Sequence, residues 1–170
     1  RKESSAASDV YKRQRIAREL ELATDRLIAR DRAGLAELAD IVGAAPRVFV
    51  LGAGRSGLAL RMTAMRLMHL GLAVHVVGEV TAPAIEPGDL LLAASGSGTT
   101  GGIVRAAQTA VDAGARVAAI TTVPDSPLAT LAAVTVVVPA ADKLDRSGAA
   151  SEQYACLLYT SDAADDSLRV

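Results

Sequence analysis

The sequence predicts an α/β fold: a three-layer, doubly wound, five-stranded parallel sheet of the flavodoxin-like type. Short runs of Val, Ile, Leu and Ala alternate along the chain with helical segments, and these runs are apolar throughout. Continuous apolar strands are typical of parallel sheets whose two faces are both covered by helices. Only 2% of the residues are aromatic, so the core between these layers must be aliphatic.

Length, charge and cysteine content limit the class of protein. A chain of 170 residues is long enough for one domain with a substantial core. Its net charge of −1, without a basic stripe, argues against nucleic acid as a partner. No apolar run approaches the ~18 residues that would span a membrane, and we expect no membrane partner and no secretory signal. One cysteine, Cys156, fits a reducing compartment, so we expect a cytoplasmic protein.

The two ends of the chain are related to each other through their DNA. If Asp9–Gln14 is encoded GAT GTG TAT AAG AGA CAG, the complementary strand, read in a shifted frame, encodes Cys156–Thr160. Codon choices exist that continue this inverted repeat outward to both termini. Such a repeat is typical of an adapter joined to both ends of a DNA fragment. We therefore expect residues 1–14 and 156–170 to be non-native tails, and residues 15–155 to form a C-terminally truncated domain.

The expected elements follow in order along the chain. Residues 15–43 carry apolar residues at helical spacing and form one long helix, or two helices broken near Gly34. Strands are expected at 47–52, 73–77, 89–94, 116–122 and 134–139, and further helices at 56–70, 101–114 and 126–132. Gly71 and Gly114 should end two of these helices, and Ser126 should cap the third. We expect the strand order 2-1-3-4-5, because the loops after the first and third strands should meet.

Two glycine-rich loops follow strands at the same edge of the predicted sheet. Gly52-Ala53-Gly54-Arg55-Ser56-Gly57 matches the dinucleotide-binding fingerprint, with Glu79 about where a ribose-binding carboxylate would follow. The second loop, 94–102, opens directly into a helix and carries four hydroxyl residues, which are Ser95, Ser97, Thr99 and Thr100. Hydroxyls and helix N-terminal N–H groups bind phosphate without a metal. A dinucleotide site leaves the second loop unexplained, whereas a sugar-phosphate site uses both loops.

These segments resemble the sugar-isomerase (SIS) domain, and within it most closely the 6-phospho-3-hexuloisomerase family. The resemblance covers essentially all of 15–155 and rests on RVFVLGAGRSGLALRMTAMRLMHLG, VVGEVTAP, GDLLLAASGSGTTGG and ITTVPDSPLATLAAVTVVVPA. It implies interconversion of 3-hexulose 6-phosphate and fructose 6-phosphate through an enediol, which needs a general base and no cofactor. A sugar phosphate as partner and self-association as a tetramer are also implied.

The resemblance assigns roles to residues of both loops. The substrate-binding residues that it implies are Gly54, Arg55, Ser56, Ser95, Ser97, Thr99 and Thr100, with the hydroxyls on the phosphate. Arg55 would stabilise enediolate or phosphate charge, or form a surface salt bridge. Glu79 is a candidate catalytic residue or a loop surface charge. His69 is expected to pack or to lie at an interface, and His75 to pack in the core.

The family's catalytic glutamate follows a Gln-x-x-Gly-Ser-x-Phe-Glu pattern that this chain begins and does not complete. Gln153 fits the first position, and Cys156–Thr160 then replaces the remainder. Glu152 does not align with the missing base, so the catalytic residue stays unassigned and we expect this chain to be inactive. Two alternatives remain open: an SIS arabinose-5-phosphate isomerase, and the sugar-phosphate-sensing domain of a transcription regulator.

Overall fold

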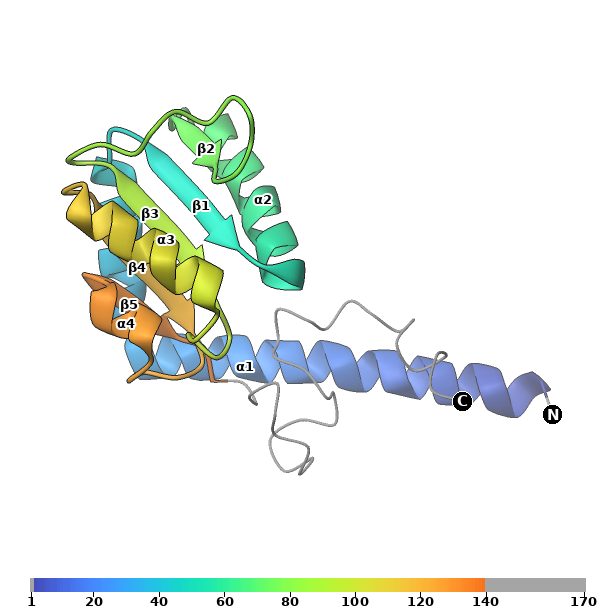
Figure 1. The fold of residues 1–170 in the computed structure, drawn as a ribbon. Helices are drawn as coiled ribbons and strands as arrows, with labels where there is room; N and C mark the ends of the chain where they lie inside the picture. Colours follow the sequence, from blue (N-terminus) through green and yellow to red (C-terminus); the bar gives the residue numbers. More distant parts are fainter. Residues whose placement is uncertain (1, 140–170) are drawn as a thin grey trace.

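The computed structural model describes residues 2–139, which form a parallel sheet between two layers of helices (Figure 1). The strands are β1 (Val48–Gly52), β2 (Val74–Val76), β3 (Leu90–Ala94), β4 (Arg116–Thr121) and β5 (Val134–Val137). They lie in the order β2-β1-β3-β4-β5, and each strand is parallel to its neighbours. The predicted fold class and strand order are therefore confirmed.

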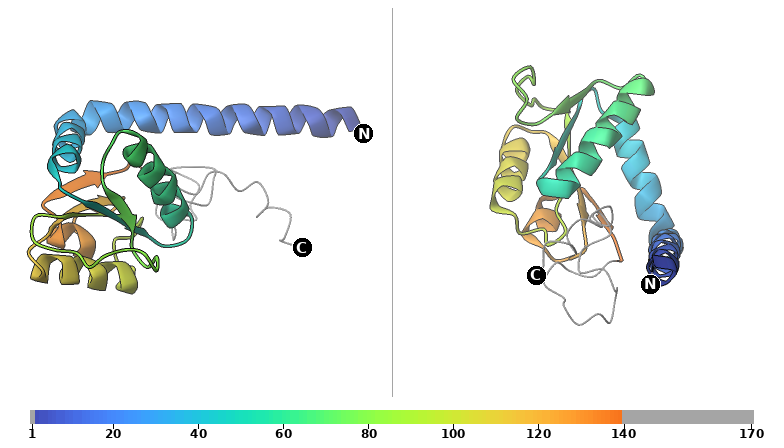
Figure 2. Two further views of the ribbon diagram at one scale, coloured as in Figure 1. Left: turned by 90° about the horizontal axis from the view of Figure 1, so that it is seen from above. Right: turned by 90° about the vertical axis from the view of Figure 1, so that its right-hand side faces the viewer.

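The helices are α1 (Lys2–Ala44), α2 (Gly54–His69), α3 (Gly101–Asp112) and α4 (Pro127–Leu131). Helices α1 and α2 pack on one face of the sheet, and α3 and α4 pack on the other (Figure 2). Gly71 and Gly114 follow α2 and α3 with φ of 89° and 79°, and Ser126 caps α4, as predicted. None of the helices within residues 2–139 combines the length and hydropathy needed to cross a bilayer.

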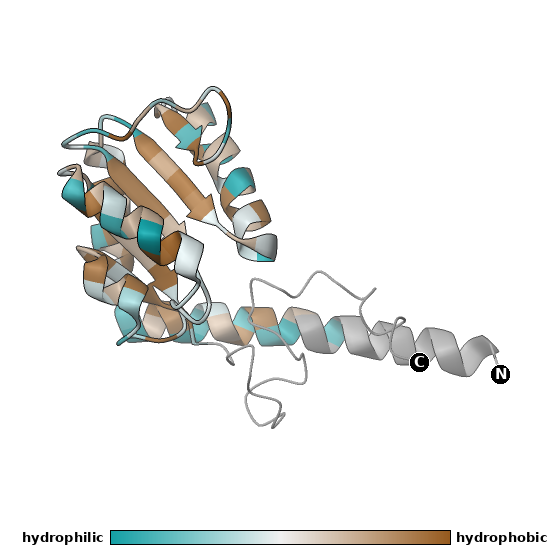
Figure 3. Ribbon diagram, viewed as in Figure 1, coloured by the Kyte–Doolittle hydropathy of each residue, from teal (hydrophilic) through white to brown (hydrophobic). Residues whose placement is uncertain are grey.

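Strands β1 and β3 have buried side chains on both faces, which explains why their sequences are apolar (Figure 3). In β1, Val48 and Val50 point towards α1 and α2, whereas Phe49 points towards α3. In β3, Leu91 shares the α3 face with Phe49. Because successive side chains of a strand point to opposite faces, a strand covered twice has no polar position to alternate with.

Helix α1 is broken at Asp31, where the backbone leaves helical geometry (φ −146°, ψ 53°). The Asp31 carboxylate accepts a hydrogen bond of 2.9 Å from the Gly34 N–H, so Asp31 caps the helical segment that follows. The predicted break near Gly34 is thus confirmed in its two-helix form. The segment before the break extends away from the sheet (Figures 1 and 2). It begins at Lys2, earlier than expected, and the structure does not test whether residues 1–14 are native.

An ion pair joins the amino ends of the neighbouring strands β1 and β3. Arg47, just before β1, donates from Nε and Nη2 to the carboxylate of Asp89, just before β3, over 3.0 and 2.6 Å. Asp89 is buried and also accepts the Glu86 N–H at 2.8 Å. These hydrogen bonds, above all those from Arg47, hold the pKa of the Asp89 carboxyl below its ordinary value. The pair fixes the end of the β2–β3 connection against β1.

Candidate functional site

The two glycine-rich loops begin side by side at the carboxyl edge of the sheet. Gly52, the last residue of β1, is the register partner of Ala94, the last residue of β3. From this point the chain enters α2 on one face and α3 on the other. Adjacent strands whose helices leave to opposite faces form a switch point, which is where open α/β sheets bind ligands. The structure thus brings together the two loops that the sequence singled out.

The loop after β1 is drawn tight by contact between two glycine backbones. A Cβ on Gly57 would lie 2.5 Å from the Gly52 carbonyl oxygen, so only glycine fits at this approach. Gly54 starts α2 with φ of 54°, a conformation that also favours glycine. Ser56 is buried in the first turn of α2, and Arg55 is partly buried beside it. The spacing of the glycines therefore serves the tight strand-to-helix turn itself.

The loop after β3 is organised by pairs of hydroxyl groups. The buried Ser95 Oγ lies 3.0 Å from Thr100 Oγ1. Further out, Ser97 Oγ lies 2.9 Å from Thr99 Oγ1 and accepts the Thr99 N–H at 3.3 Å. Thr99 and Thr100 are exposed. Each of the four predicted hydroxyls thus has another of the four as its neighbour, and together they form one polar cluster at the start of α3.

The electrostatics of the two loops favour an anion. Arg55 is the sole charged residue in residues 52–57 and 95–100, and neither loop has an acid. Helix α3 has no acidic residue in its first turn, and no capping bond from the Thr100 side chain occurs in the described part of the chain. The Ile103 N–H already donates to the Thr100 carbonyl at 2.9 Å, so the N–H groups of Gly101 and Gly102, with the helix dipole, are those that can meet a negatively charged group.

Residues at the end of β4 and just after it contact the backbone of the hydroxyl loop. Gly98 has φ of 63°, and a Cβ there would collide with the Ser126 side chain. The Gly98 carbonyl accepts the Leu128 N–H at 3.1 Å, and the Gly96 carbonyl accepts from both Thr121 and Thr122. The sequence alone does not assign the two threonines to the site. Their position at the end of a predicted strand, on the same edge as the loops, is the feature that could have indicated it.

Glu79 and the two histidines lie outside the loop pair. Glu79 follows β2, where its carboxylate is about half exposed and lies 3.5 Å from Arg61 of α2. His75 packs in the sheet, with its ring centroid 5.2 Å from that of Phe49, as expected. His69 is exposed in the last turn of α2, at the helix end opposite the glycine loop. It is therefore not packed within this chain, and an interface role remains a prediction.

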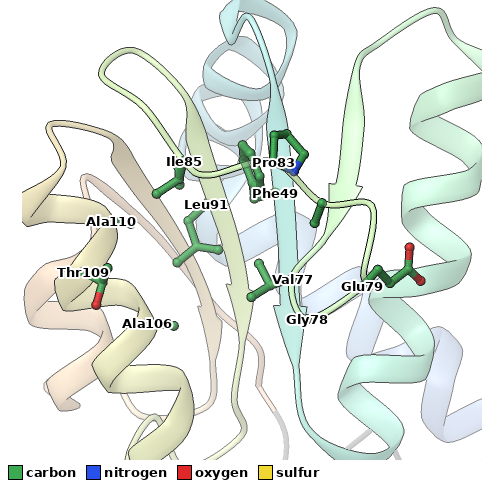
Figure 4. A pocket seen from close by; sticks show the side chains of 11 residues that line it. Phe49, Val77, Gly78, Glu79, Pro83, Ile85, Leu91, Ala106, Thr109 and Ala110 are labelled. Atoms are coloured by element: carbon green, nitrogen blue, oxygen red, sulfur yellow. The ribbon is translucent and has the colours of Figure 1, made fainter.

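A cavity of about 310 Å³ lies between the β2–β3 connection and α3 (Figure 4). Phe49 and Leu91 line it from the sheet, and Glu79 lies at its border. Residues 77–89 are all described and contain no helix, so this part of the sheet face lacks the cover that α3 provides over β3 and β4. Within residues 2–139, no three His, Cys, Asp or Glu side chains are grouped to hold a metal ion.

The fold and the paired loops define a doubly wound α/β domain whose two glycine-rich loops lie at the strand switch point. Within that class, the chain belongs to the SIS domain family, whose sequence profile matches residues 41–158.

Named relatives narrow the comparison. The chain is 66% identical over 113 residues to a 3-hexulose-6-phosphate isomerase of Mycobacterium gastri, a match that covers 66% of this chain and 57% of that protein. It is 38% identical over 112 residues to a 3-hexulose-6-phosphate isomerase of Bacillus subtilis, and covers 60% of it. The chain therefore matches somewhat more than half the length of these curated relatives.

A solved structure with the same fold comes from Methanococcus jannaschii. It is a hypothetical protein for which the structure infers a molecular function of 3-hexulose-6-phosphate isomerase. The TM-score is 0.68 at 32% sequence identity, and the match covers 75% of this chain and 72% of that one. The chain therefore shares its fold with that protein.

Proposed function

We propose that this chain is the sugar-phosphate-binding domain of a 3-hexulose-6-phosphate isomerase. The observation that carries the proposal is the pairing of Gly52 with Ala94, which starts the glycine loop and the hydroxyl loop side by side. The 66% identity to the Mycobacterium gastri isomerase supports the choice of substrate within the family. The reaction would convert 3-hexulose 6-phosphate into fructose 6-phosphate.

In this proposal the hydroxyl loop binds the phosphate. Ser95, Ser97 and Thr100 donate to phosphate oxygens, with Thr99 beside them, and the first turn of α3 adds N–H groups and its dipole. The pairing of these hydroxyls with one another supports this role, because the O–H of a hydroxyl paired with another hydroxyl can turn towards an anion. The absence of acids from both loops removes any charge repulsion.

The glycine loop would face the sugar. Gly54 and Ser56 line the start of α2, and Arg55 stabilises negative charge on the enediolate or the phosphate. The reaction moves a proton between two adjacent carbons, which requires a general base at those carbons. Glu79 remains a candidate of lower rank. It follows β2, which β1 separates from β3, and its carboxylate lies 3.5 Å from Arg61.

We further propose that this chain binds the sugar phosphate and does not isomerise it. The family's base is a glutamate that follows the motif begun at Gln153, and Cys156–Thr160 supplies no carboxylate. These positions lie outside the residues that the structure describes. Loss of a general base lowers the rate by about 10²–10⁴-fold and need not abolish binding.

The test compares this chain with a chimera. The chimera replaces residue 156 onward by the corresponding segment of the Mycobacterium gastri isomerase, and both proteins are assayed for conversion of 3-hexulose 6-phosphate to fructose 6-phosphate. We expect both to bind fructose 6-phosphate, and the chimera to turn over at least about 10²-fold faster. Comparable turnover by the two would place the base within residues 15–155, with Glu79→Gln as the next variant. Preference of both for arabinose 5-phosphate would contradict the proposed substrate.

We also propose that the native protein is cytoplasmic and self-associates. The exposed apolar face of α2 supports the second point: Leu58, Met62, Met65, Met68 and Leu70, at its end, are 50–76% exposed. Apolar patches of several hundred Å² on a folded protein generally mark interaction sites. A second copy of the chain is the partner that the family resemblance implies.

A further inference from the structure

The carbonyl oxygen of Gly96, within the hydroxyl loop, accepts three hydrogen bonds. The donors are the Thr122 N–H at 3.0 Å, the Thr122 hydroxyl at 2.9 Å and the Thr121 hydroxyl at 3.0 Å. All three come from the carboxyl end of β4. A carbonyl oxygen has two lone pairs, so a third donor makes this an unusually strongly held group.

The Gly96 carbonyl determines the direction of the next N–H. In a trans peptide the C=O and the following N–H are fixed in one plane and point in opposite directions. Because the Gly96 oxygen points towards β4, the N–H of Ser97 points away from β4. Strand β3 lies between β4 and β1, so this N–H is directed to the side where the glycine loop begins. That side is the space between the two loops.

The three donors also strengthen the Ser97 N–H as a hydrogen-bond donor. A peptide whose oxygen accepts several hydrogen bonds is more polarised, and its N–H carries more positive charge. The next two N–H groups bond within the loop: the Gly98 N–H donates to the Ser95 carbonyl at 3.1 Å, and the Thr99 N–H donates to Ser97 Oγ at 3.3 Å. The Ser97 N–H is therefore the main-chain donor of the loop that β4 orients.

We infer that Thr121 and Thr122 are positioning residues for the sugar-phosphate site. They hold the Gly96–Ser97 peptide so that the Ser97 N–H donates to a phosphate oxygen, and the inference rests on the proposed function. The two threonines differ in their burial and in their other hydrogen bonds. Thr121 is fully buried and also accepts the Val123 N–H at 3.2 Å, so its loss would disturb the end of β4 itself. Thr122 is partly buried, which makes it the residue to substitute.

The test removes the Thr122 hydroxyl and then restores it. Thr122→Val keeps the shape and loses the donor, whereas Thr122→Ser keeps the donor. We expect Thr122→Val to weaken binding of fructose 6-phosphate and of inorganic phosphate by about tenfold, as measured by calorimetry. Thr122→Ser should stay within about twofold of the unchanged chain. Thr63→Val is the matched control, because Thr63 donates at 3.0 Å to a backbone carbonyl in α2, away from the loop.

A spectroscopic measurement separates orientation from stability. In the unchanged 17.4 kDa chain and in Thr122→Ser, phosphate should shift the Ser97 amide proton downfield, and in Thr122→Val this shift should be lost. Equal affinity and an equal Ser97 shift in Thr122→Val would overturn the positioning role alone. Failure of the unchanged chain to bind either ligand would overturn the proposed function, and this inference with it.

Discussion

Gly98 turns the hydroxyl loop over the start of α4. Its φ of 63° lies in the left-handed region, and the Ser126 side chain occupies the space that a Cβ would need. Ser126 cannot move away without cost, because its Oγ accepts the Ala129 N–H that caps α4. A side chain at Gly98 is therefore disfavoured both by the left-handed backbone and by the space that Ser126 occupies.

Gly98→Ala should consequently damage both stability and binding. We expect a loss of roughly 1–3 kcal/mol in the free energy of unfolding, from backbone strain and overpacking, and affinity for fructose 6-phosphate lowered at least severalfold. Chemical denaturation and calorimetry measure the two effects. Gly43→Ala is the control, since no described atom lies within 4 Å of its Cβ position, and it should be neutral or slightly stabilising. Equal behaviour of the two variants would contradict this account of Gly98.

Asp89 makes stability depend on pH. The Arg47 hydrogen bonds lower the pKa of this carboxyl in the folded chain, so the stabilisation is present above the unfolded value of about 3.9. It is lost as the pH falls through the lower folded pKa. Asp89→Asn should reduce the thermal midpoint at pH 7, and the gap from the unchanged chain should narrow below about pH 4. A gap that stayed constant down to pH 2 would contradict an ionised role for Asp89.

The sequence predicted the position of the two glycine-rich loops better than it predicted the residues that hold them in place. Ser95, Ser97 and the glycines stand directly after apolar runs, so their place at the strand ends follows from chain order alone. The contacts of Thr122 with Gly96 and of Arg47 with Asp89 depend on which strands are neighbours and in which register. Residues 42 positions apart become partners only when β1 and β3 pair, and no local pattern contains that information.

The break in α1 is another feature that the hydrophobic pattern of the sequence could not decide. Apolar spacing continues through residues 15–43, so periodicity alone could not choose between one helix and two. The choice depends on Asp31, whose carboxylate caps the Gly34 N–H. A side chain at Gly34 would meet that carboxylate, so Asp31 would have to shift and the cap would change. Polar side chains that compete for the backbone therefore decide where a long amphipathic pattern divides.

The exposed face of α2 gives a prediction about assembly. Met62→Lys places a charge in the middle of the apolar face and should shift the chain towards a lower oligomeric state, as measured by light scattering at several concentrations. Gln108→Lys adds the same charge on the exposed side of α3 and should leave the oligomeric state unchanged. An unchanged mass for Met62→Lys, with an oligomer present in the parent chain, would exclude this face as the contact.

At the scale of the whole molecule, the architecture was predictable because the strands are mainly apolar and glycine, proline or serine residues mark the boundaries of α2, α3 and α4. The β2–β3 connection is the exception to the regular strand–helix alternation. It is short, contains Pro83 and Pro87, and has no helix. The cavity beside this loop was not predicted, because it lies between the loop and α3, next to Phe49 and Leu91, and this arrangement exists only once the layers are assembled.

The separation of 42 positions between Arg47 and Asp89 affects how the protein is made as well as how it is held together. During synthesis β1 emerges well before β3, so the edge of β1 that will pair with β3 has no partner while the chain between them is still being added. An unpaired apolar strand is a template for strands of other chains. The hazard for this protein is therefore transient, falling in the interval between these two strands, and the speed of translation across residues 53–94 sets how long it lasts.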